Sequence, residues 1–559
     1  MKFCAFLHKD AKCKEIFALY CSFVTDKLIF MKNGLLALFV FLIPLFSLAQ
    51  KKEKTSIEVI HADEWSFDKD VGEDITIIRG NAVFKHDSAF LHCDSAYLNE
   101  KANNLDAFSN VHVIDNDTIH MWGDRLHYEG NSRTAVMYGD VKLKDPTTEL
   151  YTDKLFYDRN NGSSYYTTGG EIFNGDNILT SIYGYYFTEE DMLFFKDSVV
   201  VTNPDYVMKG DTLRYNTKTE VVYFQGPTTL VSEENNMYCE NGFYDTKNEF
   251  AQFKENIIIY YDEQILSADS IYYNKAIEYG EAFRNVVMTD TSQNLEVHGN
   301  YAEYHRNDGF SFVTDSALAM MYEDSDTLFL HADTLKTYFN DSTRQAEQLF
   351  AWFNTKFYRN DIQGMCDSLS YNFADSIISL FNDPVLWSEE NQLTADTIFI
   401  YSSNNQISRM RLSNAAFIIS IDDTLQFNQI QGRDMTALFT DNELRTVLVD
   451  GNARTIYYLR DEDESLVGIN KAESSNMKIW VEDNELKRIA YMQQPHAPLY
   501  PPDKLAAGER TLKGFKWLDS DRPANRHDIF VRITEEIQTP VSESDVIPPE
   551  PAIPDTTGR

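Results

Sequence analysis

The sequence predicts an all-β protein built as one elongated array of repeats, and three observations support this. Aromatic residues make up 13% of the 559 residues, with 32 Tyr and 37 Phe. A short sequence unit recurs about every 30 residues, and apolar residues alternate with period two in both halves of that unit. Aromatic residues are enriched in strands, and a period of two is typical of a strand with one buried face. The chain is also longer than one ordinary globular core, which favours a repeat array.

The first half of the unit is a small residue, then Asp, then apolar residues at the second and usually the fourth following position. Examples are WGDRLHY (122–128) and KGDTLRY (209–215). Successive steps are 28 to 34 residues, except for the last step of 38. The key position recurs thirteen times, at Asp63, Asp94, Asp124, Asp153, Ser181, Asp211, Glu240, Asp269, Asn300, Asp333, Asp367, Asp396 and Asp434.

The second half of the unit begins with an aromatic or apolar residue before a turn pair rich in Gly, Asn and Asp. A strand with alternating apolar positions follows, as in FSNVHV (108–113) and FKENIII (253–259). Because a slip of one residue would turn every apolar side chain to water, the register of these strands is well specified. One unit cannot bury its apolar face alone, whereas stacked units bury it continuously. Thirteen rungs at a strand spacing of ~4.8 Å would extend roughly 60 Å.

The alternation also separates the side chains that face inward from those that face outward. Arg125, Lys154, Arg214 and Tyr272 belong to the outer face. Large inward side chains fit a closed packed core as well as an apolar trough that holds a ligand, so both interpretations are kept. The candidate inward face consists of Val111, Val113, Leu126, Tyr128, Val141, Leu143, Leu155, Tyr157, Val199, Val201, Leu213, Tyr215, Ile257, Ile259, Ile271 and Tyr273.

Residues 1–49 are predicted to be a leader that ends in a secretory signal peptide. Met31-Lys32 opens a short basic region, and an almost unbroken apolar run follows from Leu35 to Phe46. Small residues at the end of this segment predict cleavage after Ala49, with Met31 as the true start of the protein. The apolar run is short for a membrane span, and a longer signal-anchor is the alternative. We therefore expect an exported protein.

Two further segments complete the predicted organisation. The repeat array is expected over residues 50–491, with a division into two halves near residue 300, where the period loosens. Residues 492–559 lack the pattern and are rich in proline and acidic residues, which is typical of an extended tail. Within this tail, GFKWLDSDRP (514–523) is either a docking segment or a cap.

Charge and motif content exclude several function classes. The net charge is −37, and removal of residues 1–49 takes away six Lys/Arg and three Asp/Glu, which leaves −40. So acidic a chain is not expected to bind nucleic acid, or a polyanionic lipid mainly through its phosphates. No catalytic, metal-binding or cofactor-binding motif is present, so no enzyme activity and no cofactor are predicted. Calcium binding by the recurrent Asp is disfavoured, because toxin-type β-rolls need glycine-rich nonapeptides. The mature cysteines are expected to be small buried fillers: Cys93, Cys239 and Cys366.

The repeat resembles the LptA/OstA-like family, the periplasmic proteins of lipopolysaccharide transport and organic-solvent tolerance. The matching features are the ADEWSFD opening (62–68), both recurrent half-repeats and the preceding signal peptide. The resemblance covers nearly the whole array and implies a twisted antiparallel β-jellyroll, open like a folded taco, with an apolar interior. This chain is longer than short members of that family, and it has no room for the large barrel of the outer-membrane insertion protein.

That resemblance implies a periplasmic lipopolysaccharide-binding bridge protein, which could also be associated with the outer membrane. The lipid A acyl chains would then be the bound moiety, and the sixteen inward residues the candidate lipid-binding face. The implied partners are other jellyroll transport proteins at the inner and outer membranes, joined by edge-strand pairing, and head-to-tail self-association is a further option. Strand addition is expected near 57–60 and 489–492. A secreted structural or adhesive β-solenoid that binds protein or glycan is the alternative.

Overall fold

The structure of the protein is a computed structural model. It describes residues 55–532, apart from 188–189, 234, 323–325, 341–344, 404–405, 424–425, 442, 462, 464 and 483–484. The chain divides into two units, Met1–Thr55 and Ser56–Arg559, and the second unit holds all the strands reported below. The predicted leader and signal peptide, and residues 533–559 of the predicted tail, lie outside the described residues.

The described residues form 38 strands and three short 3-10 helices. The strands up to residue 305 are β1 Glu58–His61, β2 Glu64–Phe67, β3 Ile75–His86, β4 Ala89–Asn99, β5 Asn104–Asp115, β6 Ile119–Glu129, β7 Thr134–Lys144, β8 Thr148–Asp158, β9 Ser163–Tyr166, β10 Gly170–Asn174, β11 Asn177–Ser181, β12 Tyr183–Phe187, β13 Met192–Asn203, β14 Tyr206–Asn216, β15 Val221–Ser232, β16 Asn236–Asp245, β17 Phe250–Tyr261, β18 Gln264–Asn274, β19 Tyr279–Asp290 and β20 Leu295–His305.

The remaining elements are on average shorter, because many strands are interrupted midway. They are β21 Phe310–Thr314, β22 Leu318–Tyr322, β23 Thr327–His331, β24 Thr334–Phe339, β25 Ala346–Arg359, β26 Ile362–Asn372, β27 Ile377–Phe381, β28 Val385–Ser388, β29 Asn391–Thr394, β30 Thr397–Ser403, β31 Gln406–Ser413, β32 Phe417–Asp423, β33 Gln426–Gln431, β34 Asp434–Thr440, β35 Glu443–Arg460, β36 Leu466–Glu482, β37 Glu485–Met492, β38 Leu499–Tyr500, η1 Ala507–Glu509, η2 Asp519–Asp521 and η3 Asp528–Phe530.

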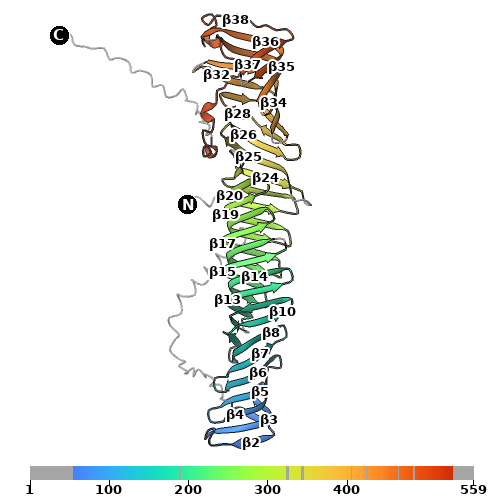
Figure 1. Cartoon of the computed structure of the whole chain (residues 1–559), viewed down its shortest axis with the longest axis vertical. Coiled ribbons are helices and arrows are strands. Elements are labelled where there is room, and N and C mark those ends of the chain that lie inside the picture. The colour runs from blue at the N-terminus through green and yellow to red at the C-terminus, as the bar shows by residue number, and fades with distance from the viewer. Residues whose placement is uncertain are drawn as a thin grey trace, which may run out of the picture. The chain divides into compact units, whose positions relative to one another are not determined.

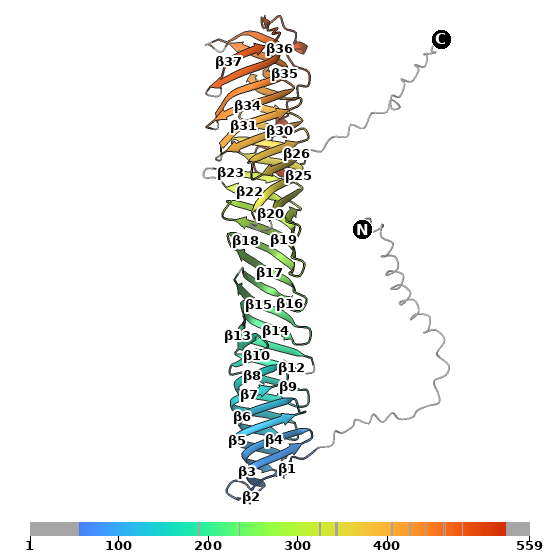
Figure 2. The ribbon, with the colours of Figure 1, turned by 90° about the vertical axis from the view of Figure 1, so that its right-hand side faces the viewer.

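Antiparallel pairing of successive strands stacks the second unit into a long ladder (Figures 1 and 2). Strand β4 pairs with β3 and β5, for example, and β5 pairs in turn with β6. The predicted all-β class and elongated antiparallel array are therefore confirmed. Each repeat supplies two rungs rather than one, so thirteen repeats extend roughly 120 Å at a strand spacing of ~4.8 Å. The length of roughly 60 Å expected from one rung per repeat was wrong.

A bulge in the middle of alternate long strands, such as β3, β5 and β7, brings the two sequence signatures together. In β5 the register shifts between Phe108 and Val111, where Ser109 and Asn110 have φ of 62° and 48°. The Asn110 amide donates a hydrogen bond to the key Asp94 of the preceding strand at 2.7 Å. Equivalent bonds join Asn81 to Asp63, Asn256 to Glu240, Asn285 to Asp269 and Asn354 to Asp333. The recurrent acidic residue thus holds the neighbouring strand at its bulge. We call each such point, where the strands bend, a corner.

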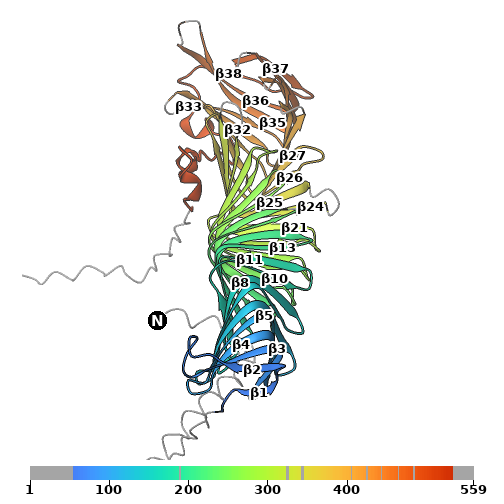
Figure 3. The ribbon, with the colours of Figure 1, turned by 60° about the horizontal axis from the view of Figure 1, so that its bottom comes forward.

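The corners bend every long strand, so that each strand belongs to two half-sheets with a shared apolar interior. In β6, for example, Met121 before the corner and Leu126 after it are both buried in the same core cluster. This cluster runs from Ile57 to Ile479, almost the whole length of the ladder. Figure 3 shows the strand direction rotating progressively along the ladder, as the right-handed twist of strands requires.

The segment after β38 folds back along the outer face of the C-terminal strands, and we call residues 501–532 the strap. The backbone N–H of Leu512 donates a hydrogen bond to the buried side chain of Gln429, and that of Leu518 donates to the buried side chain of Gln392. A second apolar cluster on the outside of the ladder, which includes Leu512, joins the strap to β32, β35 and β36. In Figure 1 the red strap lies beside β28. The GFKWLDSDRP segment therefore docks onto the array.

Candidate functional site

The sixteen inward positions all lie on the inside of the two half-sheets. Four of them, Val201, Tyr215, Ile259 and Tyr273, are partly buried. The predicted orientation of these side chains is therefore correct, whereas their role in lipid binding stays a prediction. The twelve buried members are Val111, Val113, Leu126, Tyr128, Val141, Leu143, Leu155, Tyr157, Val199, Leu213, Ile257 and Ile271.

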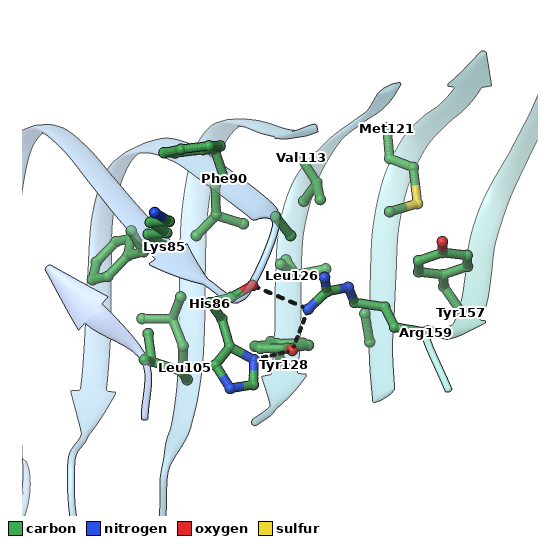
Figure 4. Close-up of a pocket in the computed structure, with 15 residues that line it drawn as sticks. Lys85, His86, Phe90, Leu105, Val113, Met121, Leu126, Tyr128, Tyr157 and Arg159 are labelled. Carbon is green, nitrogen blue, oxygen red and sulfur yellow. Dashed lines mark hydrogen bonds between the residues drawn. The ribbon is translucent and has the colours of Figure 1, made fainter. Parts of the chain in front are cut away.

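A small apolar cavity lies between the half-sheets near the N-terminal end of the ladder (Figure 4). Its volume is about 40 Å³. Four of the predicted inward residues line this cavity together: Val113, Leu126, Tyr128 and Tyr157. A cavity of this size holds little more than one water molecule. Side chains therefore fill the interior here, and a guest molecule needs the half-sheets to separate.

The half-sheets meet along two rows of hairpin turns, and we call the line between these rows the seam. The first row includes the turns at 87–88 and 116–118, and the second includes those at 100–103, 130–133 and 159–162. Within the second row, neighbouring turns are joined by backbone hydrogen bonds such as that from Gly130 N to Asn103 O. The strand pairings described above run along each half-sheet, so side chains make the connection across the seam.

A cluster of polar side chains crosses the seam directly over the cavity. Arg159 in the second row donates to both carboxylate oxygens of Asp115 in the first row, at 2.9 and 3.1 Å. It also donates to His86 O and to the Tyr128 hydroxyl, as Figure 4 shows. The Tyr157 hydroxyl donates to Asp115 at 3.1 Å. The Arg159 and Asp115 side chains are only 9% and 2% exposed, so this is a buried ion pair.

Two neighbouring contacts repeat this connection. Arg133 in the second row pairs with Asp87 in the first row at 2.9 Å. Ile57 N, just before the first strand, donates to the side chain of Asn103 in the second row at 2.9 Å. The N-terminal part of the seam is thus closed by polar contacts at successive turns.

The buried environment of the ion pair raises the pKa of Arg159 and of the neighbouring Tyr157. Burial opposes the charged form of Arg159, but its hydrogen bonds to Asp115 and Tyr128 outweigh this effect and raise its pKa. Burial, together with the negative charge of Asp115, raises the pKa of Tyr157. Both side chains therefore keep their protons throughout the physiological range. Further along the array, burial raises the pKa of Tyr206 to about 12.

The prediction from sequence did not single out the polar residues of the seam. The sequence feature that could have drawn attention to Arg133 and Arg159 was the scarcity of cations, with 50 Lys and Arg against 87 Asp and Glu. Arg133 and Arg159 also occupy corresponding turns of successive repeats, 26 residues apart. Their partners lie in the other row, and nothing in the repeat pattern indicates which turns face each other.

The two ends of the interior differ. At the first rung, Trp65 lies opposite the inward Ile78, yet Trp65 and the neighbouring Phe67 are each 55% exposed. At the last rung, the Tyr491 hydroxyl reaches the opposite half-sheet and donates to Asn470 at 2.8 Å. The interior therefore presents apolar rings at its N-terminal end, whereas a hydrogen-bonded tyrosine crosses it at the C-terminal end.

Thiol reactivity, metal binding and membrane-spanning helices are the remaining features to consider in the described part of the chain. Cys93, Cys239 and Cys366 are unpaired and buried, which confirms that they fill space in the core. Burial raises the pKa of each thiol, to about 12, 11 and 12, so thiolate chemistry is suppressed. Among the described residues no group of His, Cys, Asp and Glu could hold a metal ion. No helix there is long and apolar enough to cross a membrane.

Comparison with known proteins gives a family for the N-terminal part of the array. Residues 54–211 match the model of the OstA-like protein family. The chain carries an OstA-like region. The matched OstA-like segment contains the cavity, the Arg159–Asp115 pair and most of the N-terminal repeats, which confirms the resemblance seen in the sequence.

Other comparisons add little to the OstA-like match. No curated protein sequence matches the chain. One solved structure that matches is LptH from Pseudomonas aeruginosa, described as the LptA-homologous periplasmic component of the conserved lipopolysaccharide transport device. The two are 17% identical with a TM-score of 0.18, and the match covers 19% of this chain and 79% of that one.

Proposed function

We propose that this protein binds lipopolysaccharide in the periplasm and carries it toward the outer membrane, without catalysing a reaction. The observation that carries the proposal is the single apolar interior that runs from Ile57 to Ile479 in an array whose first part is OstA-like. Such an interior can shield the lipid A acyl chains along its whole length.

The energetics favour acyl chains as the bound moiety. Burial of one methylene group contributes about 0.8 kcal/mol, so several chains can be held without a charged contact. The inward positions are similar from rung to rung, as with Leu126, Leu155 and Leu213, which are all buried. A bound chain can therefore move along the array by small steps.

Access to the interior requires the seam to part. Side chains fill the space between the half-sheets, and the cavity of about 40 Å³ is much smaller than an acyl chain. The rows of turns are joined across the seam by side chains such as those of Arg159 and Asp115. Breaking side-chain contacts opens the interior without unpairing any strand, which keeps the cost of opening low.

The ends of the array are the proposed contacts with other jellyroll transport proteins or with a second copy of this chain. At the N-terminal end, β1 and β2 form the edge, and the exposed Trp65 and Phe67 could continue a partner's apolar interior. At the other end, β37 and the residues around β38 form the last rung. Pro498 and Pro501 lack the backbone N–H that strand pairing needs. The edge at β37 is therefore better suited to strand addition than the edge around β38.

Site-specific photo-crosslinking in cells tests the proposal. A photoreactive residue at Val141 or Tyr215, which face inward, should capture lipopolysaccharide. The matched controls are their outward neighbours Lys142 and Arg214. Capture at the outward positions alone would contradict a lipid-carrying interior.

A packed interior also fits a second candidate function, that of a structural or adhesive β-solenoid at the cell surface. This candidate predicts that depletion of the protein leaves surface lipopolysaccharide and detergent tolerance unchanged. The lipid carrier predicts that both decrease, because less lipopolysaccharide would reach the outer membrane.

A further inference from the structure

The C-terminal part of the array carries a polar groove on its outer face that the apolar interior does not explain. The groove has a volume of about 630 Å³. Its lining includes three arginines, Arg409, Arg411 and Arg433, together with Thr436 and Asn476. These residues come from β31, β34, β36 and the turn before β34.

Strand register explains why the arginines converge. In β31 the side chains of Met410 and Leu412 are buried in the core, so the alternating Arg409 and Arg411 point outward. Arg411 lies opposite Thr436 of β34. At the adjacent corner, Asp434 lies opposite Asp450, which in turn lies opposite Asn476 of β36. The groove is therefore built by regular pairing of strands rather than by a flexible loop.

The arginines of the groove keep hydrogen-bonding capacity. Arg433 donates one bond to Asp434 at 2.8 Å, and its side chain is still 63% exposed. The Arg409 guanidinium lies 3.9 Å from the centroid of the Tyr401 ring. The positive charge of Arg411 helps to lower the pKa of Asp434, but within the described residues its side chain makes neither a hydrogen bond nor an ion pair. Three guanidinium groups with free donors thus share one groove.

This local charge is opposite to that of the whole protein. The chain carries a net charge of −37, yet only Asp434 and Asp450 oppose the three arginines in the lining of the groove. Further along the same half-sheet, Lys478 and Arg488 lie 4.7 and 4.6 Å from the Trp480 ring. A positive region on an acidic surface concentrates anions locally, whatever the sign of the total charge.

We propose that this groove binds a phosphorylated saccharide. Guanidinium groups match phosphate oxygens with paired hydrogen bonds, whereas Thr436, Ser475 and Asn476 suit sugar hydroxyls. Asp434 and Asp450 also accept bonds from hydroxyls, and their charge disfavours a bare polyphosphate. Identifying the ligand as the headgroup of lipopolysaccharide rests on the proposed function, but the affinity for the phosphorylated saccharide does not.

Calorimetric titration of the purified full-length protein tests the groove without involving the interior. The probe is the phosphorylated oligosaccharide released from lipopolysaccharide by complete removal of its acyl chains. Arg411→Gln should weaken its binding about tenfold, and Arg409→Gln with Arg411→Gln about a hundredfold. Binding should also weaken as salt increases. The matched control is Arg79→Gln with Arg284→Gln, which removes two exposed arginines far from the groove and should leave affinity unchanged.

Two further probes separate the sources of phosphate. The enzymatically dephosphorylated oligosaccharide should bind at least about tenfold more weakly, and inorganic phosphate should also bind more weakly than the intact probe. Equal affinity for the phosphorylated and dephosphorylated sugars would overturn the proposal, as would unchanged affinity in the double variant. Inorganic phosphate that binds as tightly as the sugar would overturn the saccharide assignment. The probe has no acyl chains, so a negative result for the groove does not affect the crosslinking test at Val141 and Tyr215. A negative crosslinking result likewise does not affect the test of the groove.

Discussion

The guanidinium of Arg159 is bonded to the carboxylate of Asp115 across the seam, although 44 residues separate them in the chain. The two residues belong to different rows of turns, and Arg159 lines the apolar cavity (Figure 4). It therefore joins the two half-sheets at a point where the backbone does not. Whatever enters the interior here must displace this contact.

Replacing Arg159 with methionine should open the seam at this point. The change keeps much of the side-chain volume but leaves the Asp115 carboxylate, 2% exposed, without its cation. Loss of one partner from a buried ion pair costs about 3–5 kcal/mol. Chemical denaturation should show a loss of stability of this size, and hydrogen exchange should accelerate at the turns 87–88 and 116–118.

Arg460→Met is a matched control for this experiment. Arg460 pairs with Asp422 at 2.7 Å, but the two residues lie at neighbouring turns of one row, and Arg460 is 29% exposed. This variant should lose less stability and should leave exchange near the cavity unchanged. If both variants changed exchange at 87–88 equally, the Arg159 pair would have no particular role in closing the seam.

The fold was predictable from the sequence because alternation of period two records which side chains are buried. Leu126 and Tyr128 point inward, and Arg125 points outward, as the pattern predicts. The pairing of the two signatures was not predictable, because the repeat shows Asp94 and Asn110 as separate features. Only the register of neighbouring strands reveals that they meet at one corner.

The candidate site was predictable only in its apolar part. Val113 and Tyr157 share the face that the sequence assigned to them, and the structure adds that they line one cavity. The contacts of Arg159 and of the strap span long stretches of sequence, such as the 124 residues between Gln392 and Lys516. Alternation within one strand carries no information about such partners.

Gly139→Ala should destabilise the array at a corner. Gly139 has φ of 78°, and a Cβ atom there would lie 2.3 Å from a carboxylate oxygen of Asp124. Backbone strain and the clash together should cost about 2–4 kcal/mol. Gly175→Ala is the control, since Gly175 has φ of 55° with no atom within 4 Å of the added Cβ. The control should lose only about 1 kcal/mol, and equal losses in thermal denaturation would exclude the clash at Asp124.

Gln392→Ala should loosen the strap. The Gln392 side chain is fully buried, donates to Lys516 O and accepts from Leu518 N, both at 2.7 Å. The variant leaves both backbone groups of the strap without partners, which costs about 1–3 kcal/mol for each buried group. Limited proteolysis should then cut within 507–518 faster than in the unmodified protein. Gln264→Ala, which changes an exposed glutamine outside the strap, should leave the cleavage rate unaltered.

The far end of the strap should detach in acid, and His331 is the group responsible. Burial is the main cause that lowers the pKa of His331, whose Nδ1 lies 2.7 Å from Ala317 O and whose ring lies 4.5 Å from that of Phe530. The hydrogen bond to Ala317 O and the charge of Asp333 oppose this shift, whereas Arg532 and Lys356 reinforce it. Two bonds hold the strap end on the array: Lys356 donates to Val531 O, and Arg532 of the strap donates to Asp333.

The sign of the pH dependence follows from the lowered pKa. The neutral imidazole is preferred in the folded state, so its contribution to stability is complete above the usual histidine pKa of about 6.5. As pH falls below that value, the detached state takes up the proton more readily, and the contact with Phe530 is progressively lost. Hydrogen exchange at 528–532 should therefore accelerate between about pH 6.5 and 5. His331→Gln should remove this dependence, and persistence of the same pH profile in that variant would assign the effect to another group.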